Sequence, residues 1–312
     1  WVGVELFFVL SGFLITTILL AEARSRKTVD FRAFLMRRIL RIWPLYFVGL
    51  GLGFFVFPVT DPHAQFWRHL AAYAVFLGNY SMAQVGFQSF GFASSQLWSV
   101  CIEEHYYLVW GALLGLGLSR PTLALFALAA AGFSVFIPIA LYAPNDDTWY
   151  LRSHTHMWSV MMGSLCGLAF SLRWLGVFRS RWQLLLLLPA TWFFVEWLGS
   201  HLKPLPWTVV FSGLYFSYVL MLALAGPWWL GWLQSRPLLW LGRLTYGLYV
   251  FHIFALNLTR GWLSGFQDRP VLQYFLTGSI GLSLTIGVAW LSWKFLEKPI
   301  LDLKRRFRPG FH

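Results

Sequence analysis

Long apolar runs separated by short polar segments set the pattern of this chain. Nine runs of low charge predict membrane-spanning helices, because each is close to the roughly 20 residues that a helix needs to cross a bilayer. They lie near residues 2–21, 43–59, 98–118, 121–142, 156–172, 182–198, 207–226, 238–258 and 271–295. A shorter run at 70–83 suits a re-entrant or interfacial helix better than a crossing. The pattern predicts an all-α fold: a polytopic membrane helix bundle of about nine spanning helices plus one short re-entrant or interfacial helix.

The composition supports a membrane environment for most of the chain. Of the 312 residues, 58% are apolar and only 12% are charged. A soluble domain carries roughly 25% charged residues, about twice this fraction. We interpret residues 1–312 as a single membrane domain, with a basic loop at 22–42 and a loop that carries the short helix at 60–97.

The basic residues are distributed unevenly between the predicted loops. If the run at 70–83 does not cross, 19 of the 24 Lys and Arg residues fall on one side of the membrane and 5 on the other. Loops rich in Lys and Arg stay in the cytoplasm. We therefore expect a multi-pass protein of the cytoplasmic (inner) membrane, with a cytoplasmic C-terminus and 22–42 loop and an extracytoplasmic 60–97 loop. The cytoplasmic retention of these basic loops also explains the net charge of +12, so no nucleic-acid partner is expected.

The beginning of the chain is unusual. Trp1 lies inside an apolar run, with no Met and no basic segment before it, which is unlike a signal peptide. The charge bias also places the start of the 2–21 span outside the cytoplasm. We therefore expect an N-terminally truncated domain, with one further helix upstream.

Two adjacent carboxylates, Glu103 and Glu104, lie in an apolar run shortly after Ser99 and just before His105. Ionisable residues inside a bilayer are costly and usually functional or paired. At 1.5 Å per residue the carboxylates lie about 8–9 Å from the outer end of the span, and adjacent helical residues point roughly 100° apart. We predict different roles for the two, one facing the bundle interior and the other a helix neighbour or water. The alternative is a pair at the start of a helix, held by interfacial water.

Three arginines lie close together before the second span. Arg37, Arg38 and Arg41 are spaced so that all three can share one helical surface. Guanidinium groups suit phosphates because each can donate two parallel hydrogen bonds. The spacing indicates a phosphate-binding cluster, and simple anchoring of the loop in the cytoplasm is the alternative.

Histidines and cysteines give weaker signals. His156 and His252 lie in the outer halves of predicted spans, and each could contact a substrate or serve only in packing. Cys101 and Cys166 lie in apolar runs, and the sequence has neither a CxxC nor an HExxH motif. We therefore expect neither a disulfide framework nor a metal site.

Six segments together resemble the acyltransferase-3 family of integral membrane O-acyltransferases. They occur in the family's order over nearly the whole chain, and they are Gly3–Thr16, Arg37–Pro44, Leu97–Leu108, Ser153–Gly163, Leu241–His252 and Phe295–Pro299. The resemblance implies transfer of an acyl group, typically acetyl from acetyl-CoA as donor substrate, to a hydroxyl of an extracytoplasmic carbohydrate. It assigns Arg38 and Arg41 to the donor and Glu103 and Glu104 to catalysis.

The sequence departs from the family pattern in three ways. The family's first helix, which carries a histidine regarded as the catalytic base and an arginine, has no counterpart here. His105 stands where the family commonly has Gln, and no esterase-like domain follows Pro299. We expect the sequence as given to be inactive or badly impaired, and His105 is not favoured as a substitute base.

Two other classes of function remain open from the residues alone. A transporter or flippase for a carbohydrate or acyl carrier would use the carboxylates as a proton relay. A scaffold in a polysaccharide-synthesis complex would tolerate substitution of Glu103 and Arg41. Consumption of acyl-CoA separates an enzyme from both.

Overall fold

The computed structural model describes residues 2–56, 66–86, 94–141, 147–172, 206–225, 231, 234–266 and 269–303. The elements within these residues are all helical, and none is a strand. The chain forms two compact units. The first comprises Trp1–Phe31 and Ile102–Trp232, and the second comprises Arg32–Cys101 and Leu233–His312.

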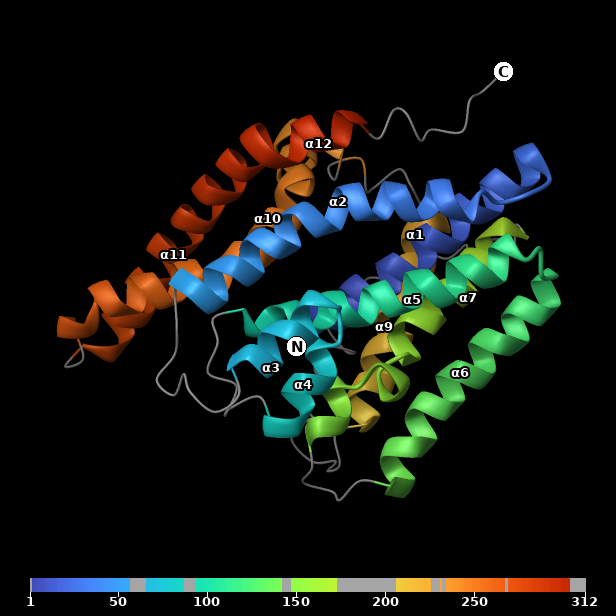
Figure 1. Ribbon diagram of the computed structural model, residues 1–312, viewed down its shortest axis with the longest axis horizontal. Helices are drawn as coiled ribbons and strands as arrows, with labels where there is room; N and C mark the ends of the chain where they lie inside the picture. The colour runs from blue at the N-terminus through green and yellow to red at the C-terminus, as the bar shows by residue number, and fades with distance from the viewer. Residues whose placement is uncertain are drawn as a thin grey trace. The chain divides into compact units, whose positions relative to one another are not determined.

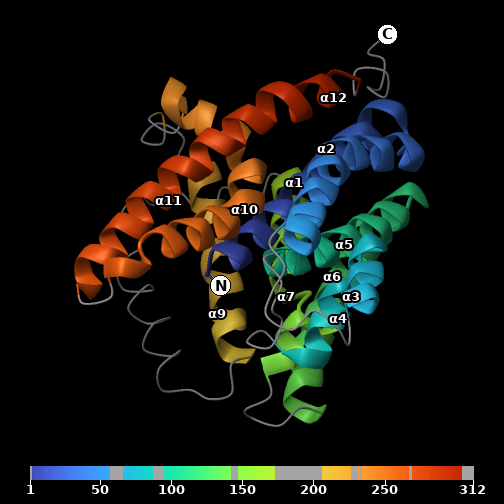
Figure 2. The same cartoon turned by 60° about the vertical axis from the view of Figure 1, so that its left-hand side comes forward.

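The helices of the first unit are apolar for most of their length, which suits contact with lipid. A helix also satisfies its backbone hydrogen bonds internally, as a lipid environment requires. Helix α1 packs against α7 and α9, and α6 also packs against α7 (Figures 1 and 2). Two short 3₁₀ segments, η3 and η4, precede α7. The bounds are α1 Val2–Arg26, α5 Trp98–Gly115, α6 Arg120–Leu141, η3 Asp147–Leu151, η4 Ser153–Thr155, α7 Trp158–Ser171 and α9 Pro206–Ala225.

Glycines allow α1 and α7 to approach backbone to backbone. A Cβ atom added to Gly12 of α1 would lie 2.0 Å from the carbonyl oxygen of Val160, and one added to Gly163 of α7 would lie 2.0 Å from that of Val9. Small residues permit such approaches between membrane helices. Gly163 and Gly167 of α7 both face α1.

In the second unit, α10 and α11 pack along each other (Figure 1). Gly247 of α10 lies against Ala289 of α11, and Gly281 of α11 lies against Leu256 of α10, so the two helices are antiparallel. Both begin with a proline in the first turn, where its missing N–H costs nothing. The bounds are α2 Phe31–Gly51, η1 Leu52–Val56, α3 Phe66–Ala74, α4 Gly78–Val85, η2 Ser95–Leu97, α10 Arg236–Trp262, η7 Ser264–Phe266, α11 Pro270–Ser292, η8 Trp293–Glu297 and α12 Lys298–Leu303.

Five of the described helical segments are long and apolar enough to cross a membrane: Gly3–Arg26, Phe31–Val56, Arg120–Pro138, Arg236–Trp262 and Pro270–Leu303. The all-helical character and several apolar helices therefore agree with the expected fold class. The count of about nine spans is not confirmed. Helix α7 is apolar but shorter, and the predicted span at 182–198 lies outside the described residues.

The run at 70–83 is not one helix. It is divided between α3 and α4, and Phe76 between them has a left-handed backbone with a φ of 60°. Most of the 22–42 segment, interpreted from the sequence as a basic loop, is helical. Helix α1 continues to Arg26 and α2 begins at Phe31, so only residues 27–30 connect them.

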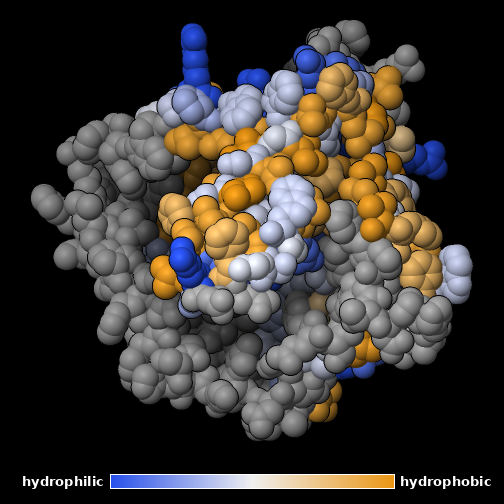
Figure 3. Space-filling view, turned by 90° about the vertical axis from the view of Figure 1, so that its left-hand side faces the viewer, coloured by the Kyte–Doolittle hydropathy of each residue, from blue (hydrophilic) through white to orange (hydrophobic). Residues whose placement is uncertain are grey.

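Apolar side chains face outward on many helices. On the face shown in Figure 3, orange apolar side chains form broad areas of the described surface, and strongly hydrophilic side chains are few. Exposed examples include Phe136 on α6 and Val271 and Phe275 on α11. Water would disfavour so much exposed apolar surface, whereas lipid accommodates it.

Candidate active site

Helix α5 places both predicted carboxylates in the interior. Glu103 is 4% exposed and Glu104 is 6% exposed, so neither faces open solvent. Both side chains are therefore buried, and different roles for the two remain a prediction. Carboxylates this deep in apolar helices are stable only with hydrogen-bond or charge partners.

Two hydroxyls donate hydrogen bonds to Glu103. Ser11 Oγ of α1 lies 2.5 Å from Glu103 Oε1, and Tyr107 OH donates to the same oxygen from one turn further along α5. Residues four apart on a helix lie on one face, which explains the Tyr107 contact. The carboxylate is therefore oriented by a neighbouring helix and by its own.

Further hydrogen bonds join α5 to α1. Tyr106 OH donates to the carbonyl oxygen of Gly12 at 3.3 Å and lies 2.9 Å from Ser164 Oγ of α7. Trp110 Nε1 donates to Thr16 Oγ1 at 2.8 Å. The polar faces of α5 and α1 therefore meet along about two turns, with Ser11 and Glu103 at one end.

Another buried carboxylate, Glu5 of α1, is 0% exposed. Its Oε1 accepts a hydrogen bond from Tyr150 OH at 3.0 Å, and Ser159 Oγ donates to its Oε2. His156 Nε2 lies 3.1 Å from Oε1, an ion pair when the imidazole is protonated. The aromatic rings of Phe8 and Tyr150 contact the imidazole edge to face.

The other candidate histidines lie elsewhere. His105 Nδ1 lies 2.6 Å from Ser153 Oγ, which joins α5 to η4 in the first unit. In the second unit, His252 Nδ1 lies 2.6 Å from the backbone carbonyl of Tyr249. A carbonyl only accepts, so Nδ1 of His252 carries the proton of this bond.

Ser99 belongs to the second unit, and its hydroxyl contacts Tyr249 of α10. Its Oγ lies 2.6 Å from Tyr249 OH, and Tyr249 in turn donates to the carbonyl oxygen of Gln96. Ser99 therefore takes part in the packing of α10.

The three candidate donor-binding arginines all lie on α2. They differ in burial: Arg37 is buried, Arg38 is partly buried and Arg41 is exposed. The guanidinium of Arg38 lies 5.6 Å from the centre of the Phe34 ring, a cation–π contact. The structure confirms that they share a helix, but their different burial means that they do not form one uniform surface.

Glu297 brings a carboxylate into the unit that holds these arginines. It is 6% exposed, ends the π-helical segment η8 and accepts a hydrogen bond from Ser292 Oγ at 3.1 Å. Arg41 interacts electrostatically with it. Wide helical turns of this kind are frequent at functional sites.

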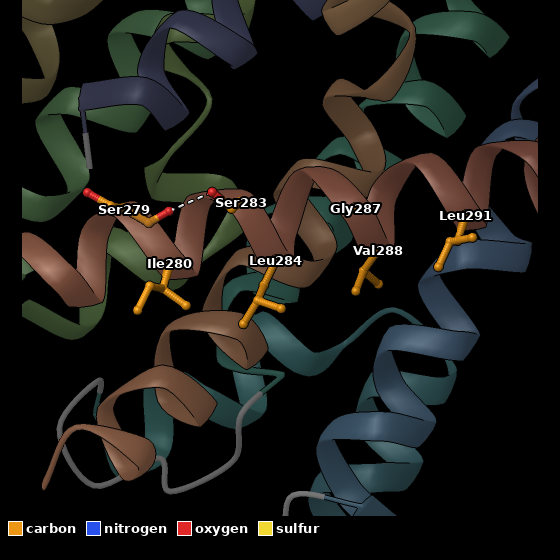
Figure 4. A pocket seen from close by; sticks show the side chains of 7 residues that line it. All are labelled: Ser279, Ile280, Ser283, Leu284, Gly287, Val288 and Leu291. Atoms are coloured by element: carbon orange, nitrogen blue, oxygen red, sulfur yellow. Dashed lines mark hydrogen bonds between the residues drawn. The ribbon is translucent and has the colours of Figure 1, made fainter.

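A shallow groove of about 520 Å³ follows α11 in the second unit. Figure 4 shows Ile280, Leu284 and Val288 projecting from one side of the helix, with Ser283 donating a hydrogen bond to the Ser279 carbonyl at 2.9 Å. The groove is lined by apolar side chains and serines and holds no titratable group, so it is a lipid- or helix-facing surface rather than a reaction site. Within the described residues no group of three His, Cys, Asp or Glu side chains could hold a metal ion.

Comparison with known proteins identifies the family. The sequence model described as an acyltransferase domain matches residues 2–294. The chain belongs to this acyltransferase family. No solved structure matches it.

Curated relatives carry names that agree with the family. The Bacillus subtilis protein named "Putative peptidoglycan O-acetyltransferase YrhL" is 30% identical over 96% of this chain and 50% of its own length. Peptidoglycan O-acetyltransferase OatA of Listeria monocytogenes is 28% identical over 96% of this chain and 51% of its own length. O-acetyltransferase OatA of Staphylococcus aureus is 25% identical over 96% and 52%. The chain therefore spans about half the length of these relatives.

Several residues of these buried clusters were not predicted from the sequence. Glu5 and Glu297 are carboxylates in apolar runs, and the rule that singled out Glu103 and Glu104 applies to them equally. Ser11 and Tyr107 gave no comparable signal, because uncharged hydroxyl side chains are common in membrane helices. Tyr107 lies four residues after Glu103 on the same helix, but only the packing of α1 on α5 reveals the contact of Ser11 with Glu103.

Proposed function

We propose that this protein is a membrane-embedded O-acyltransferase that transfers an acetyl group from acetyl-CoA to a hydroxyl of an extracytoplasmic carbohydrate. The observation that carries the proposal is the buried Glu103 carboxylate, oriented by Ser11 and Tyr107 in segments that the family match covers. The names of the curated relatives support peptidoglycan as the acceptor.

The reaction needs a group that takes the proton of the acceptor hydroxyl. As that oxygen bonds to the acyl carbon, the carbon–sulfur bond of the thioester breaks, and the thiolate leaves and takes up a proton. A buried, oriented carboxylate suits proton transfer, which contributes roughly 10²–10⁴-fold to rate. We assign proton transfer at the acceptor to Glu103, with Glu104 as the second candidate catalytic residue.

The donor is assigned to the arginines of α2. CoA carries several phosphates, and guanidinium groups bind phosphate through paired hydrogen bonds. Arg41 is exposed and can reach a ligand, and Arg38 lies one turn earlier on the same helix. The buried Arg37 is assigned a supporting position rather than direct contact.

The charge bias of the loops supports an orientation for this reaction. It places the arginines and the C-terminus in the cytoplasm, where acyl-CoA is made, and the carboxylates toward the outer side of the inner membrane. The protein would thus take its donor from one side and deliver the acyl group on the other. From the apolar runs of the sequence, we also infer about nine spanning helices.

The experiment compares Glu103→Gln with Glu104→Gln in protein expressed from its complete reading frame. Detergent-solubilised enzyme is supplied with acetyl-CoA and soluble peptidoglycan fragments, and released CoA thiol and acetylated product are both measured. We expect Glu103→Gln to lose roughly 100-fold or more in kcat with acetyl-CoA binding retained. We expect Glu104→Gln to act mainly on stability.

Two results would reject the proposal. Normal turnover by both variants would remove the carboxylates from catalysis. Movement of the carbohydrate across a vesicle membrane without release of CoA would favour the transporter class instead.

A further inference from the structure

Glu5 is anchored by one continuous segment of the first unit. Tyr150 from η3, His156 between η4 and α7, and Ser159 from the first turn of α7 all direct polar atoms at its carboxylate. Glu5 and His156 are both 0% exposed. A buried carboxylate is costly to desolvate, so a site with three partners strongly favours one arrangement of the helices that carry them.

The same helix presents Ser11 to Glu103. Six residues separate Glu5 from Ser11, or about 9 Å along the axis of α1. Glu5 is therefore too far along the helix to share a ligand atom with Glu103. Because α1 carries both Glu5 and Ser11, the position of this helix links the Glu5 site to the Ser11–Glu103 contact.

Close packing makes α1 sensitive to such an influence. Gly12, next to Ser11, lies against the backbone of Val160, and Val160 directly follows Ser159 in the Glu5 site. On the other side, Ser11 contacts Glu103 at 2.5 Å. A rotation or slide of α1 on α7 would change this short bond, because packed interiors transmit displacements.

We propose that Glu5, together with His156, is a positioning residue for acyl transfer: it fixes the register of α1 on α7 and so holds the Ser11 hydroxyl against Glu103. This inference rests on the proposed function, in which Glu103 acts on the acceptor hydroxyl. The Glu5 site takes no substrate itself, since its polar atoms are enclosed by Phe8, Tyr150 and α7.

A kinetic cycle tests whether Glu5 acts through Ser11. Glu5→Gln should lower kcat roughly tenfold with an unchanged KM for acetyl-CoA, as expected when one oriented hydrogen bond to a charged group is lost. In a Ser11→Ala background the same change should have almost no further effect on kcat, because the hydroxyl that Glu5 positions is already gone. Equal effects of Glu5→Gln in both backgrounds, or no effect in the wild-type background, would overturn the proposal.

Milder variants keep the test informative if Glu5→Gln does not fold. Tyr150→Phe and Ser159→Ala each remove one donor to Glu5 and leave its charge in place. Both should show the same dependence on Ser11. Ser134→Ala is the matched control, since this buried hydroxyl of α6 donates only to the Ala131 carbonyl at 2.8 Å among its described bonds, and kcat should not change.

A second measurement needs no turnover and separates this inference from the proposed function. Ser11 is 8% exposed, and the two native cysteines are buried. The Ser11→Cys variant should react slowly with N-ethylmaleimide, and adding Glu5→Gln should raise the labelling rate several-fold. Unchanged labelling would overturn the positioning role, even if Glu103→Gln abolishes acyl transfer. Faster labelling together with normal turnover of Glu103→Gln would reject only the catalytic role proposed for Glu103.

Discussion

Replacing Gly12 by alanine tests the close contact between α1 and α7. The added Cβ would lie 2.0 Å from the Val160 carbonyl oxygen, whereas real Cβ atoms stay at least 3.0 Å from such neighbours. The shortfall is 3.0 − 2.0 = 1.0 Å, and the obstructing atoms belong to the backbone. No side chain can rotate away, so the two helices must separate.

The size of the effect follows from this separation. Overpacking in a well-packed interior costs about 1–3 kcal/mol. A shift of about 1 Å would also take the 2.5 Å contact between Ser11 and Glu103 to the limit of hydrogen bonding. Loss of a hydrogen bond to a charged group costs about 1.5–3 kcal/mol, which corresponds to roughly 10- to 100-fold in kcat if the bond serves the transition state.

Thermal unfolding of the solubilised protein and acetyl transfer from acetyl-CoA measure the two effects. Gly3→Ala is the matched control, because Gly3 lies on the same helix and a Cβ there would meet nothing within 4 Å. We expect Gly12→Ala to lower both the unfolding midpoint and kcat, and Gly3→Ala to leave both near wild type. Wild-type stability and kcat in Gly12→Ala would refute the close packing of α1 on α7.

Two further predictions concern the second unit. Arg41→Ala should raise the KM for acetyl-CoA roughly tenfold while membrane insertion is retained, and Arg41→Lys should restore only part of the affinity because paired hydrogen bonding is lost. Arg32 is an exposed arginine on the same helix, so Arg32→Ala is the control. Equal effects of the two alanine variants on KM would mean that Arg41 only anchors the loop in the cytoplasm. Burial, with a contribution from the charge of Arg68, lowers the pKa of His69 below its usual 6.5. The unfolded chain therefore binds a proton that the folded chain excludes, so this stabilisation is present above pH 6.5 and is lost as the pH falls through the folded pKa. The unfolding midpoint should drop as the pH falls below 6.5, and His69→Asn should reduce that drop; an unchanged pH dependence in this variant would contradict the assignment.

The sequence predicts the helices better than their ends. Each predicted span other than 182–198 falls on a described helix, because long apolar runs have few alternatives in lipid. The ends differ where charged residues continue a helix beyond the apolar run: α1 extends to Arg26 and α2 begins at Phe31. Hydropathy reports the surroundings of a residue, whereas the helix continues as long as its backbone hydrogen bonds do.

The candidate site could be predicted only for its ionisable members. Glu103 and Glu104 are conspicuous because charge is rare in apolar runs. Their partners come from segments far away in sequence, such as Ser11, 92 residues before Glu103. Contact at that separation depends on which helices pack together, and a single sequence with few periodic polar positions does not determine this.

The six segments that carry the family resemblance divide between the two units in a way that supports separate tasks. In the first unit, Gly3–Thr16, the later part of Leu97–Leu108 and Ser153–Gly163 meet through the hydrogen bonds of Glu5, Ser11 and Glu103. In the second unit, Tyr246 OH of the Leu241–His252 segment donates to the Ile42 carbonyl of the Arg37–Pro44 segment at 3.0 Å, and Gly247 lies against Glu297. The buried carboxylates Glu5 and Glu103, each with hydroxyl donors, thus lie in the first unit, whereas the three candidate donor-binding arginines of α2 lie in the second unit together with the buried Glu297. An enzyme that binds a phosphate-bearing donor and deprotonates a sugar hydroxyl needs both kinds of group, and a motif that only maintained membrane packing would require neither.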